Sequence, residues 1–206
     1  MSGSEVALAR TVDAVLGHSL ARPPTLGAGR LVCIDGPAGS GKTTLGDAVV
    51  KAASRRVGTV AELHMDDLYE GWAGLGSVTE RLTTNVLRPL AQGRPGRYRR
   101  WDWLASTWAE EHVVAPVELL VLEGVASAAA AYADLVTTVV WVEADRALRL
   151  ERGIARDGES MRAEWERWMR AEDALYAAQR TRDRADLLVD GRGELQEPRG
   201  PDPATP

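Results

Sequence analysis

The sequence predicts an α/β fold in three layers, with helices on both faces of a mainly parallel sheet of about five strands. Two observations predict it: short apolar runs alternate with longer segments of helical spacing, and 206 residues suffice for one such domain. Alternation of this kind is typical of parallel strands that are joined by crossover helices. The expected strands are 30–35, 59–65, 118–123, 137–143 and 185–189, and the expected helices are 4–20, 41–54, 77–92, 126–134, 145–157 and 160–181.

Three segments fall outside this alternation. Residues 1–29 are expected to form an amphipathic helix that packs on the flank of the domain, followed by a connector that contains two prolines. Residues 94–103 alternate arginine and tryptophan with other residues, which predicts an extra strand or loop within the main domain, 30–191. Residues 192–206 are rich in proline and poor in apolar side chains, which predicts a disordered tail.

Composition excludes several classes of protein. The apolar fraction of 45% and the charged fraction of 27% are ordinary for a folded domain. A formal net charge of -5 argues against a protein that mainly binds nucleic acid or an anionic membrane, so a small molecule is the expected partner. The single Cys33 excludes an intrachain disulfide, and no apolar stretch has membrane-spanning length, so we expect a cytoplasmic protein. The oligomeric state stays open, a homo-oligomer included.

A complete phosphate-loop motif follows the first expected strand. Residues 36–43 read GPAGSGKT and match G-x-x-x-x-G-K-[ST] between a strand and a helix, which is the context that the motif requires. Glycines let backbone N–H groups turn toward an anion, Lys42 reaches the outer phosphates, and Thr43 is placed to bind Mg²⁺. The motif therefore predicts a P-loop NTPase fold that binds ATP and Mg²⁺. The expected nucleotide-binding residues are Gly36, Ala38, Gly39, Ser40, Gly41, Lys42, Thr43 and Thr44.

Other P-loop classes lack their own signatures in this chain. A GTPase needs an Asn-Lys-x-Asp element, but the only asparagine is Asn85 and no lysine follows it. The Leu-Ser-Gly-Gly-Gln run of transport ATPases is also absent, and the chain is too short for most motor or helicase cores. Phosphoryl transfer to a small molecule remains.

Two aspartates follow the second expected strand. Asp66 and Asp67 stand at its carboxyl end, where ligands bind in doubly wound sheets. A hydroxyl acceptor loses its proton as it attacks phosphorus, and an aspartate within hydrogen-bond reach is a suitable base. The alternative is that both residues only cap a turn.

Further candidate residues follow the third and fourth expected strands. Glu123 ends an apolar strand in the manner of a Walker B acid and is expected to hold Mg²⁺ directly or through water. Arg149, Arg152 and Arg156 share one helical face, and Arg162 follows them. Arginines of this kind either close over the triphosphate as a lid or form a solvated basic face.

The order of these motifs resembles that of the uridine kinase family of P-loop nucleoside kinases, with phosphoribulokinase and pantothenate kinase as more distant relatives. The resemblance spans residues 30–191 and is carried by GPAGSGKTT, MDDLY, RYRRWDW, LLVLEG, RLERGIARDG and ADLLVDG. It implies ATP-dependent transfer of the γ-phosphoryl group to a hydroxyl of a nucleoside-like acceptor. It also implies an arginine-containing lid. It implies that Asp66 is the base and a ribose ligand, with Asp67 as a second candidate base, and that Tyr69 contacts the acceptor. It further implies Mg²⁺ binding at Thr43, Glu123 and Asp66. The lid positions that it implies are Arg152, Arg156 and Arg162.

One segment departs from that family's pattern. Where the family has Tyr-Asp-Phe and then a histidine that helps to read the pyrimidine, this chain has Trp101-Asp102-Trp103 and no histidine until His112. Trp101 is expected to stack on an acceptor ring and Asp102 to accept its hydrogen bonds. The altered segment leaves two alternatives open: a kinase of another hydroxylated metabolite, such as a sugar, a vitamin or a biosynthetic intermediate, and a regulatory protein that hydrolyses ATP slowly.

Overall fold

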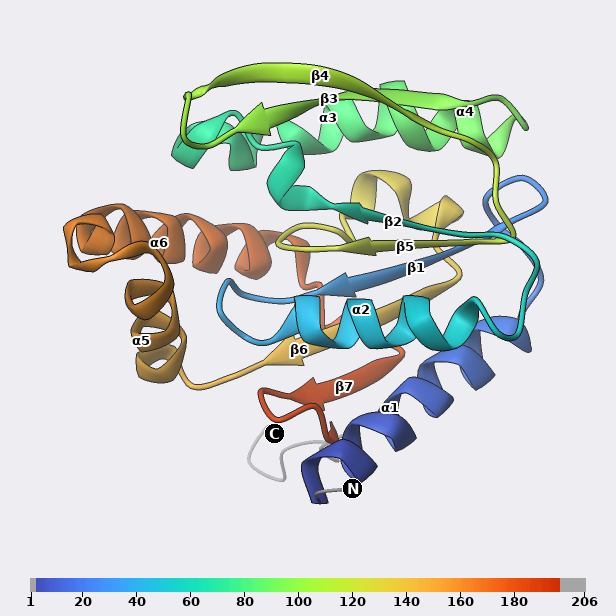
Figure 1. Ribbon diagram of the computed structural model, residues 1–206, viewed down its shortest axis with the longest axis horizontal. Helices are drawn as coiled ribbons and strands as arrows, with labels where there is room; N and C mark the ends of the chain where they lie inside the picture. The colour runs from blue at the N-terminus through green and yellow to red at the C-terminus, as the bar shows by residue number, and fades with distance from the viewer. Residues whose placement is uncertain (1–2, 197–206) are drawn as a thin grey trace, which may run out of the picture.

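The computed structural model describes residues 3–196, which form the three-layer α/β/α architecture that the sequence predicts (Figure 1). The strand order in the sheet is β2-β5-β1-β6-β7-β8, and every neighbouring pair is parallel except β7 with β8. The main strands are β1 (Arg30–Asp35), β2 (Val60–His64), β5 (Leu119–Glu123), β6 (Thr138–Glu143) and β7 (Leu187–Asp190).

The sixth strand comes from the segment that was predicted to be a disordered tail. β8 (Leu195–Gln196) pairs with β7 because the Asp190 carboxylate accepts the backbone N–H groups of Arg192 and Glu194 and so folds the chain back in a tight turn. The prediction of disorder is therefore wrong for residues 192–196. Its remainder, 197–206, lies outside the described residues.

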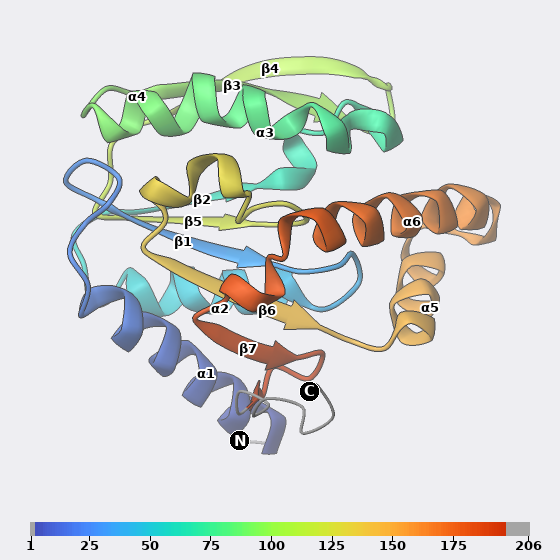
Figure 2. The same ribbon diagram turned by 180° about the vertical axis from the view of Figure 1, so that it is seen from behind.

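Apolar side chains alternate between the two faces of the sheet. Val32 and Ile34 of β1 pack toward α1 (Gly3–Leu20) and α2 (Lys42–Ala53), whereas Leu31 and Cys33 pack into the core on the opposite face, beneath α6 (Arg162–Gln179). The two views of the ribbon show α2 in front of the sheet and α6 behind it (Figure 2). Burial on both faces explains why the central strands read as continuous apolar runs.

The predicted helix at 77–92 forms, with a local distortion. It consists of α3 (Val78–Leu82), a π-helical turn (Thr83–Leu87) and α4 (Arg88–Ala91). Pro89 has no N–H to donate to the preceding turn, which accounts for the wider hydrogen-bond pattern before it.

The helix expected at 126–134 is replaced by a shorter 3₁₀ segment, Ala130–Leu135. The buried Asp35 carboxylate accepts the N–H groups of Ala126 and Ala128, and Ala126 takes a positive φ of 65°. These contacts hold the backbone after β5 in an irregular path, so a helix begins only beyond it.

Residues 96–114 form a separate antiparallel hairpin, β3 (Gly96–Asp102) and β4 (Thr107–Val114). It lies over α3 and α4, beside the β2 edge of the main sheet (Figure 1). The sequence predicted one strand or loop here and missed β4. The α5 helix (Arg146–Asp157) precedes α6 and is capped by the Asp145 carboxylate, which accepts the N–H groups of Ala147 and Leu148.

This topology places the phosphate loop at the switch point of the sheet. β1 lies between β5 and β6, and the loop leaves its carboxyl end toward α2. Ligands of open α/β sheets bind at this point, beyond the carboxyl ends of the strands. Among residues 3–196, no helix combines the length and apolar character that crossing a bilayer requires.

Candidate functional site

The phosphate loop has the backbone of an anion nest. Gly36 and Gly39 have positive φ angles of 141° and 78°. A Cβ at Gly36 would lie 2.0 Å from the Val142 carbonyl oxygen, and one at Gly39 would lie 2.7 Å from the Arg149 carbonyl oxygen. The glycines are therefore required both by conformation and by close approach of backbone. The loop ends at the start of α2, whose N-terminus favours negative charge.

Two polar groups of the loop fit a chain of phosphates. The Lys42 ammonium group is largely buried and donates to the Pro37 carbonyl oxygen at 3.0 Å. The buried Ser40 hydroxyl has no hydrogen-bond partner among the described residues. A buried polar group without a partner is unusual, and a phosphate oxygen at this loop would satisfy it.

A buried ion pair between Glu172 and Arg149 contacts the backbone of the phosphate loop. Glu172 of α6 accepts the Ala38 N–H at 2.8 Å through one carboxylate oxygen and the Arg149 guanidinium at 2.6 Å through the other. Arg149 also donates to the Ala38 carbonyl oxygen at 3.3 Å. Burial raises the pKa of Glu172, while the Ala38 N–H and Arg149 oppose that rise. Arg149 is therefore buried and supports the backbone of the phosphate loop, and it does not belong to a solvated basic face.

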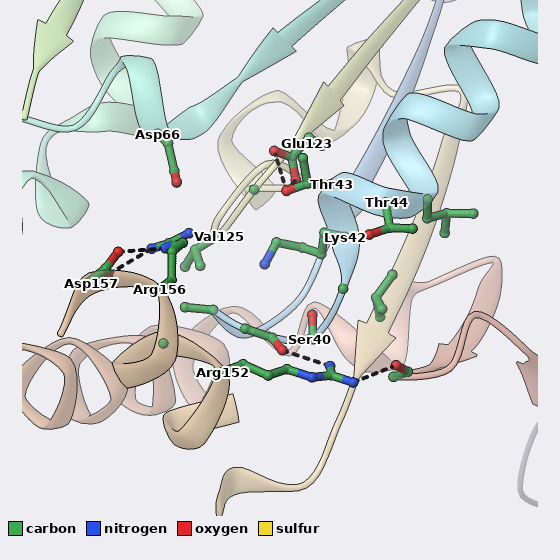
Figure 3. Close-up of a pocket in the computed structure, with 18 of the residues that line it drawn as sticks. Ser40, Lys42, Thr43, Thr44, Asp66, Glu123, Val125, Arg152, Arg156 and Asp157 are labelled. Atoms are coloured by element: carbon green, nitrogen blue, oxygen red, sulfur yellow. Dashed lines mark hydrogen bonds and ion pairs between the residues drawn. The ribbon is translucent and has the colours of Figure 1, made fainter. Parts of the chain in front are cut away.

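Arg152 also contacts the loop. It donates to the carbonyl oxygens of Gly39 at 3.1 Å and Gly191 at 3.2 Å, and so ties the phosphate loop to the turn after β7. Figure 3 shows it running beneath the loop. The lid position expected of Arg152 therefore differs from its observed one, because two backbone carbonyls hold its guanidinium.

Arg156 has the position expected of a lid residue. Figure 3 shows Arg156, Lys42 and Asp66 pointing into a common space. The Arg156 guanidinium pairs with the Asp157 carboxylate at 2.8 Å and lies over the Trp165 ring, 5.5 Å from its centroid. By contrast, Arg162 does not line the cleft: it is exposed and pairs with Glu159, three positions before it. Its predicted substrate contact stays a prediction.

Thr43 and Glu123 stand together at the cleft, as expected of a magnesium site. The Thr43 hydroxyl donates to the Glu123 carboxylate, at 3.3 and 3.4 Å from its two oxygens. Hard oxygen donors of this kind suit Mg²⁺, which usually takes one or two protein ligands and completes its shell with phosphate oxygens and water. In residues 3–196, no group of three or more His, Cys, Asp or Glu side chains could hold a metal alone. The donor set thus fits a metal that arrives with a nucleotide.

His64 is a partner of Glu123 that sequence reasoning missed. Its Nδ1 lies 2.9 Å from the Glu123 carboxylate across the β2–β5 pairing. The hydrogen bond with Glu123 raises the pKa of His64 to about 9, against the opposing effect of partial burial. This contact depends on the register between β2 and β5, which places His64 beside Glu123 and cannot be deduced from the sequence alone.

Asp66 and Asp67 lie on the 3₁₀ turn that follows β2 (Met65–Asp67). The Asp66 carboxylate is open to the cleft and points toward the space in front of Lys42 (Figure 3). Desolvation by the surrounding cleft raises the pKa of Asp66, as does the Glu123 charge, while Lys42 and Arg156 oppose the rise. Asp67 lies near Tyr98, whose pKa is raised to about 12 by burial and by the Asp67 charge. Of the two candidate bases, Asp66 has the more suitable position.

Tryptophan side chains line the part of the cleft beyond Asp66. Trp101 and Trp103 come from the hairpin, and Trp72 comes from the 3₁₀ segment Gly71–Gly76. Trp103 donates its indole N–H to the Asp66 carbonyl oxygen at 3.0 Å. The expected position of Trp101 near an acceptor is therefore consistent with the lining of the cleft.

Tyr69 and Asp102, the two other residues expected beside the acceptor, differ in position: Tyr69 lines the cleft, whereas Asp102 does not. Tyr69 is buried, and its hydroxyl donates to the Val125 carbonyl oxygen at 2.6 Å, so it supports the wall of the cleft. The Asp102 carboxylate accepts the N–H groups of Leu104 and Ala105, at 2.9 Å each, and so caps the hairpin turn rather than reading an acceptor. The contacts of Asp102 are local, whereas the contact of Tyr69 joins two distant parts of the chain.

One continuous cleft of about 990 Å³ joins the phosphate loop to the tryptophan-lined region. That volume is large enough for a nucleotide and a second small molecule side by side. The phosphate loop and the carboxyl ends of β5, β6 and β7 line it on one side, and Arg156 and Asp157 line it as well.

Comparison with known proteins identifies the fold. A structure described as a possible uridine kinase from Bacillus stearothermophilus is 22% identical, with a TM-score of 0.66 over 89% of this chain and 99% of that one. A structure described as a fructose transport system kinase from Silicibacter sp. TM1040 is 17% identical, with a TM-score of 0.59 over 81% of this chain and 94% of that one. No protein-family profile and no curated protein sequence matches the chain.

These likenesses define the chain as a P-loop kinase fold. Within that class, the fold is uridine kinase-like, as the order of the motifs suggested.

Proposed function

We propose that the protein is an ATP-dependent small-molecule kinase that transfers the γ-phosphoryl group to a hydroxyl of a nucleoside-like acceptor. The observation that carries the proposal is the position of Asp66, whose carboxylate faces the phosphate-loop Lys42 across one cleft (Figure 3). A protein that only hydrolyses ATP also uses a base, to activate water, but it does not need a tryptophan-lined compartment beside that base. The fold of the structural neighbours supports the proposal.

In the proposed reaction, the phosphate loop binds the triphosphate and orients it toward Asp66. Mg²⁺, held by Thr43 and Glu123 together with the nucleotide, would supply positive charge to the phosphates. The acceptor hydroxyl oxygen forms a bond to the γ-phosphorus, and the bond from that phosphorus to the β–γ bridging oxygen breaks to leave ADP. Asp66 accepts the hydroxyl proton, while Lys42 and Arg156 stabilise charge on the transferred group.

The elevated pKa of Asp66 supports its role. A base is most effective when its pKa approaches the working pH, since it is then both deprotonated and able to bind a proton strongly. Desolvation in the cleft moves the pKa of Asp66 in that direction. The Arg156 guanidinium is paired with the Asp157 carboxylate. We therefore expect Asp157 to orient Arg156 toward the transferred group.

A phosphoryl-transfer screen tests the proposal. Purified protein is incubated with Mg²⁺ and ATP labelled at the γ-phosphate, together with nucleosides, sugars and vitamin alcohols in separate reactions. We expect a product whose mass exceeds that of one acceptor by a phosphoryl group, in a reaction that Lys42→Ala abolishes. ATP consumption that stays at background with every acceptor would contradict the proposal.

A further inference from the structure

We infer that the first turns of α1 belong to the nucleotide site, and that Leu8 contacts the nucleoside of bound ATP. The assignment rests on the proposed kinase function, because it takes ATP as the donor. It gives a role in binding to a helix that the sequence only places on the flank of the domain. Three features carry it: the course of the cleft, the attachment of α1 to the turn after β7, and the side chains of α1 that reach the cleft.

The cleft extends from the phosphate loop in two directions. On one side it reaches Asp66 and the tryptophans, and on the other it reaches Thr44, the turn after β7 (190–193) and Leu8 of α1. Figure 3 shows Asp66 and Thr44 on opposite sides of Lys42. Transfer requires the γ-phosphate to face Asp66, so the nucleoside of the donor extends the opposite way, toward α1.

The turn after β7 joins α1 to the phosphate loop. The Thr11 hydroxyl, on a residue only 1% exposed, donates to the Gly193 carbonyl oxygen at 2.7 Å. Arg152 connects the Gly191 carbonyl oxygen of the same turn to the phosphate loop. The contact with α1 is close, since a Cβ at Gly193 would lie 3.3 Å from Leu8 Cδ1. The N-terminal end of α1 is therefore held at the end of β7, beside the cleft (Figure 1).

The two halves of α1 differ in what they cover. From residue 11 onward the helix packs on the sheet, and Val12 and Val15 are buried in the core on the α2 face. None of residues 3–10 is buried, and Leu8 is only partly covered at the margin of that core. Ser4 and Leu8 lie one turn apart on one face of the helix, and both line the cleft. The first turns of α1 thus present an aliphatic side chain to the cleft.

This end of the cleft suits a nucleoside better than further phosphate. Leu8 and Val189 supply aliphatic carbon. The Asp190 carboxylate, which also lines it, is occupied by the N–H groups of Arg192 and Glu194. A ring gains free energy when its face is removed from water against aliphatic carbon, whereas a phosphate gains none. Leu8 should therefore contribute to binding of the nucleoside and not to binding of the triphosphate.

Isothermal titration calorimetry with Mg²⁺ separates the two parts of the donor. The ligands are a non-hydrolysable ATP analogue and inorganic triphosphate, which has the phosphate chain but no nucleoside. Leu8→Ala is expected to weaken binding of the ATP analogue at least ~5-fold and to leave binding of triphosphate within about 2-fold of the parent. Leu8→Met should restore most of the affinity for the analogue, because it returns a similar volume of apolar side chain.

Val6→Ala is the matched control. It shortens another aliphatic side chain of the same helix, but Val6 is 38% exposed and does not line the cleft. We expect this variant to bind both ligands as the parent does. Thermal unfolding without ligand is measured for each variant, so that a detached helix is recognised.

Three outcomes would overturn the inference. The first is parental affinity of Leu8→Ala for the ATP analogue, and the second is an equal loss for the analogue and for triphosphate, since Leu8 would then act only through the shape of the phosphate loop. The third is the same loss in Val6→Ala.

Transfer measured on the same samples separates this inference from the kinase function. Transfer to an acceptor, with unchanged binding of the ATP analogue by Leu8→Ala, would overturn the inference and retain the kinase function. A loss of analogue affinity confined to Leu8→Ala, without transfer to any acceptor by the parent, would support the inference and contradict the kinase function. No binding of the analogue by the parent would contradict both.

Discussion

The buried pair behind the phosphate loop allows a quantitative prediction. Replacing Glu172 by alanine leaves the Arg149 guanidinium, only 5% exposed, without its counter-charge and leaves the Ala38 N–H without its acceptor. Removing one member of a buried ion pair typically costs about 3–5 kcal/mol, because the remaining charge stays desolvated. We therefore expect Glu172→Ala to lower the free energy of unfolding by about 3–5 kcal/mol. We also expect weaker binding of ATP, because the backbone of the loop loses its support.

Urea denaturation of the nucleotide-free protein measures the first effect, and calorimetric titration with an ATP analogue measures the second. Glu172→Gln is the matched comparison, since its amide oxygen can still accept the Ala38 N–H while the negative charge is lost. In the double variant Arg149→Met with Glu172→Leu, no buried charge remains, so it should be more stable than Glu172→Ala despite carrying two substitutions. A Glu172→Ala protein within ~1 kcal/mol of the parent would refute this reasoning, because a buried guanidinium would then need no partner.

Three further predictions concern the same cleft. In metal-free buffer, protonated His64 stabilises the folded protein through its hydrogen bond with Glu123. This stabilisation is fully present below the ordinary pKa of 6.5 and is lost as the pH rises through about 9. Urea denaturation should show the loss for the parent protein and not for His64→Gln. Gly39→Ala places a Cβ at a residue with positive φ and against the backbone of α5, so it should destabilise the protein by about 1–3 kcal/mol and weaken ATP binding. The control Gly76→Ala should do neither, because its Cβ would meet no atom within 4 Å. Unchanged denaturation curves for both variants would contradict this prediction. Lys42→Ala should reduce transfer at least ~100-fold while the denaturation midpoint stays close to that of the parent, and rapid transfer by this variant would exclude its role at the phosphates.

The core of the fold was predictable because its strands are buried on both faces. Runs such as residues 30–35 and 118–123 are apolar except for a charged residue at each end, and the glycine-rich motif marks the turn between the first strand and its helix. The second hairpin strand, Thr107–Val114, was missed for the opposite reason. Half of its residues are polar, and its pairing depends on cross-strand contacts such as Arg97 with Glu111, which leave no long apolar run in the sequence.

The candidate site divides in a similar way. Local motifs placed Lys42, Thr43, Asp66 and Glu123 in one cleft, because each stands at the end of a strand or the start of a helix. The contacts that support them join distant parts of the chain. Glu172 meets Ala38 across 134 positions, so its role depends on how α6 packs and could not be deduced from spacing. The same limitation applies to Arg162, since helical spacing alone does not show which residues face the cleft.

The most direct test of the proposed mechanism compares Asp66→Asn with Asp67→Asn in steady-state transfer to the best acceptor found by the screen. If the Asp66 carboxylate receives the hydroxyl proton, Asp66→Asn should lose at least ~100-fold in kcat with little change in affinity for the ATP analogue, while Asp67→Asn should retain far more of its turnover. Near-parental kcat for Asp66→Asn would contradict the account, since the base would then lie elsewhere.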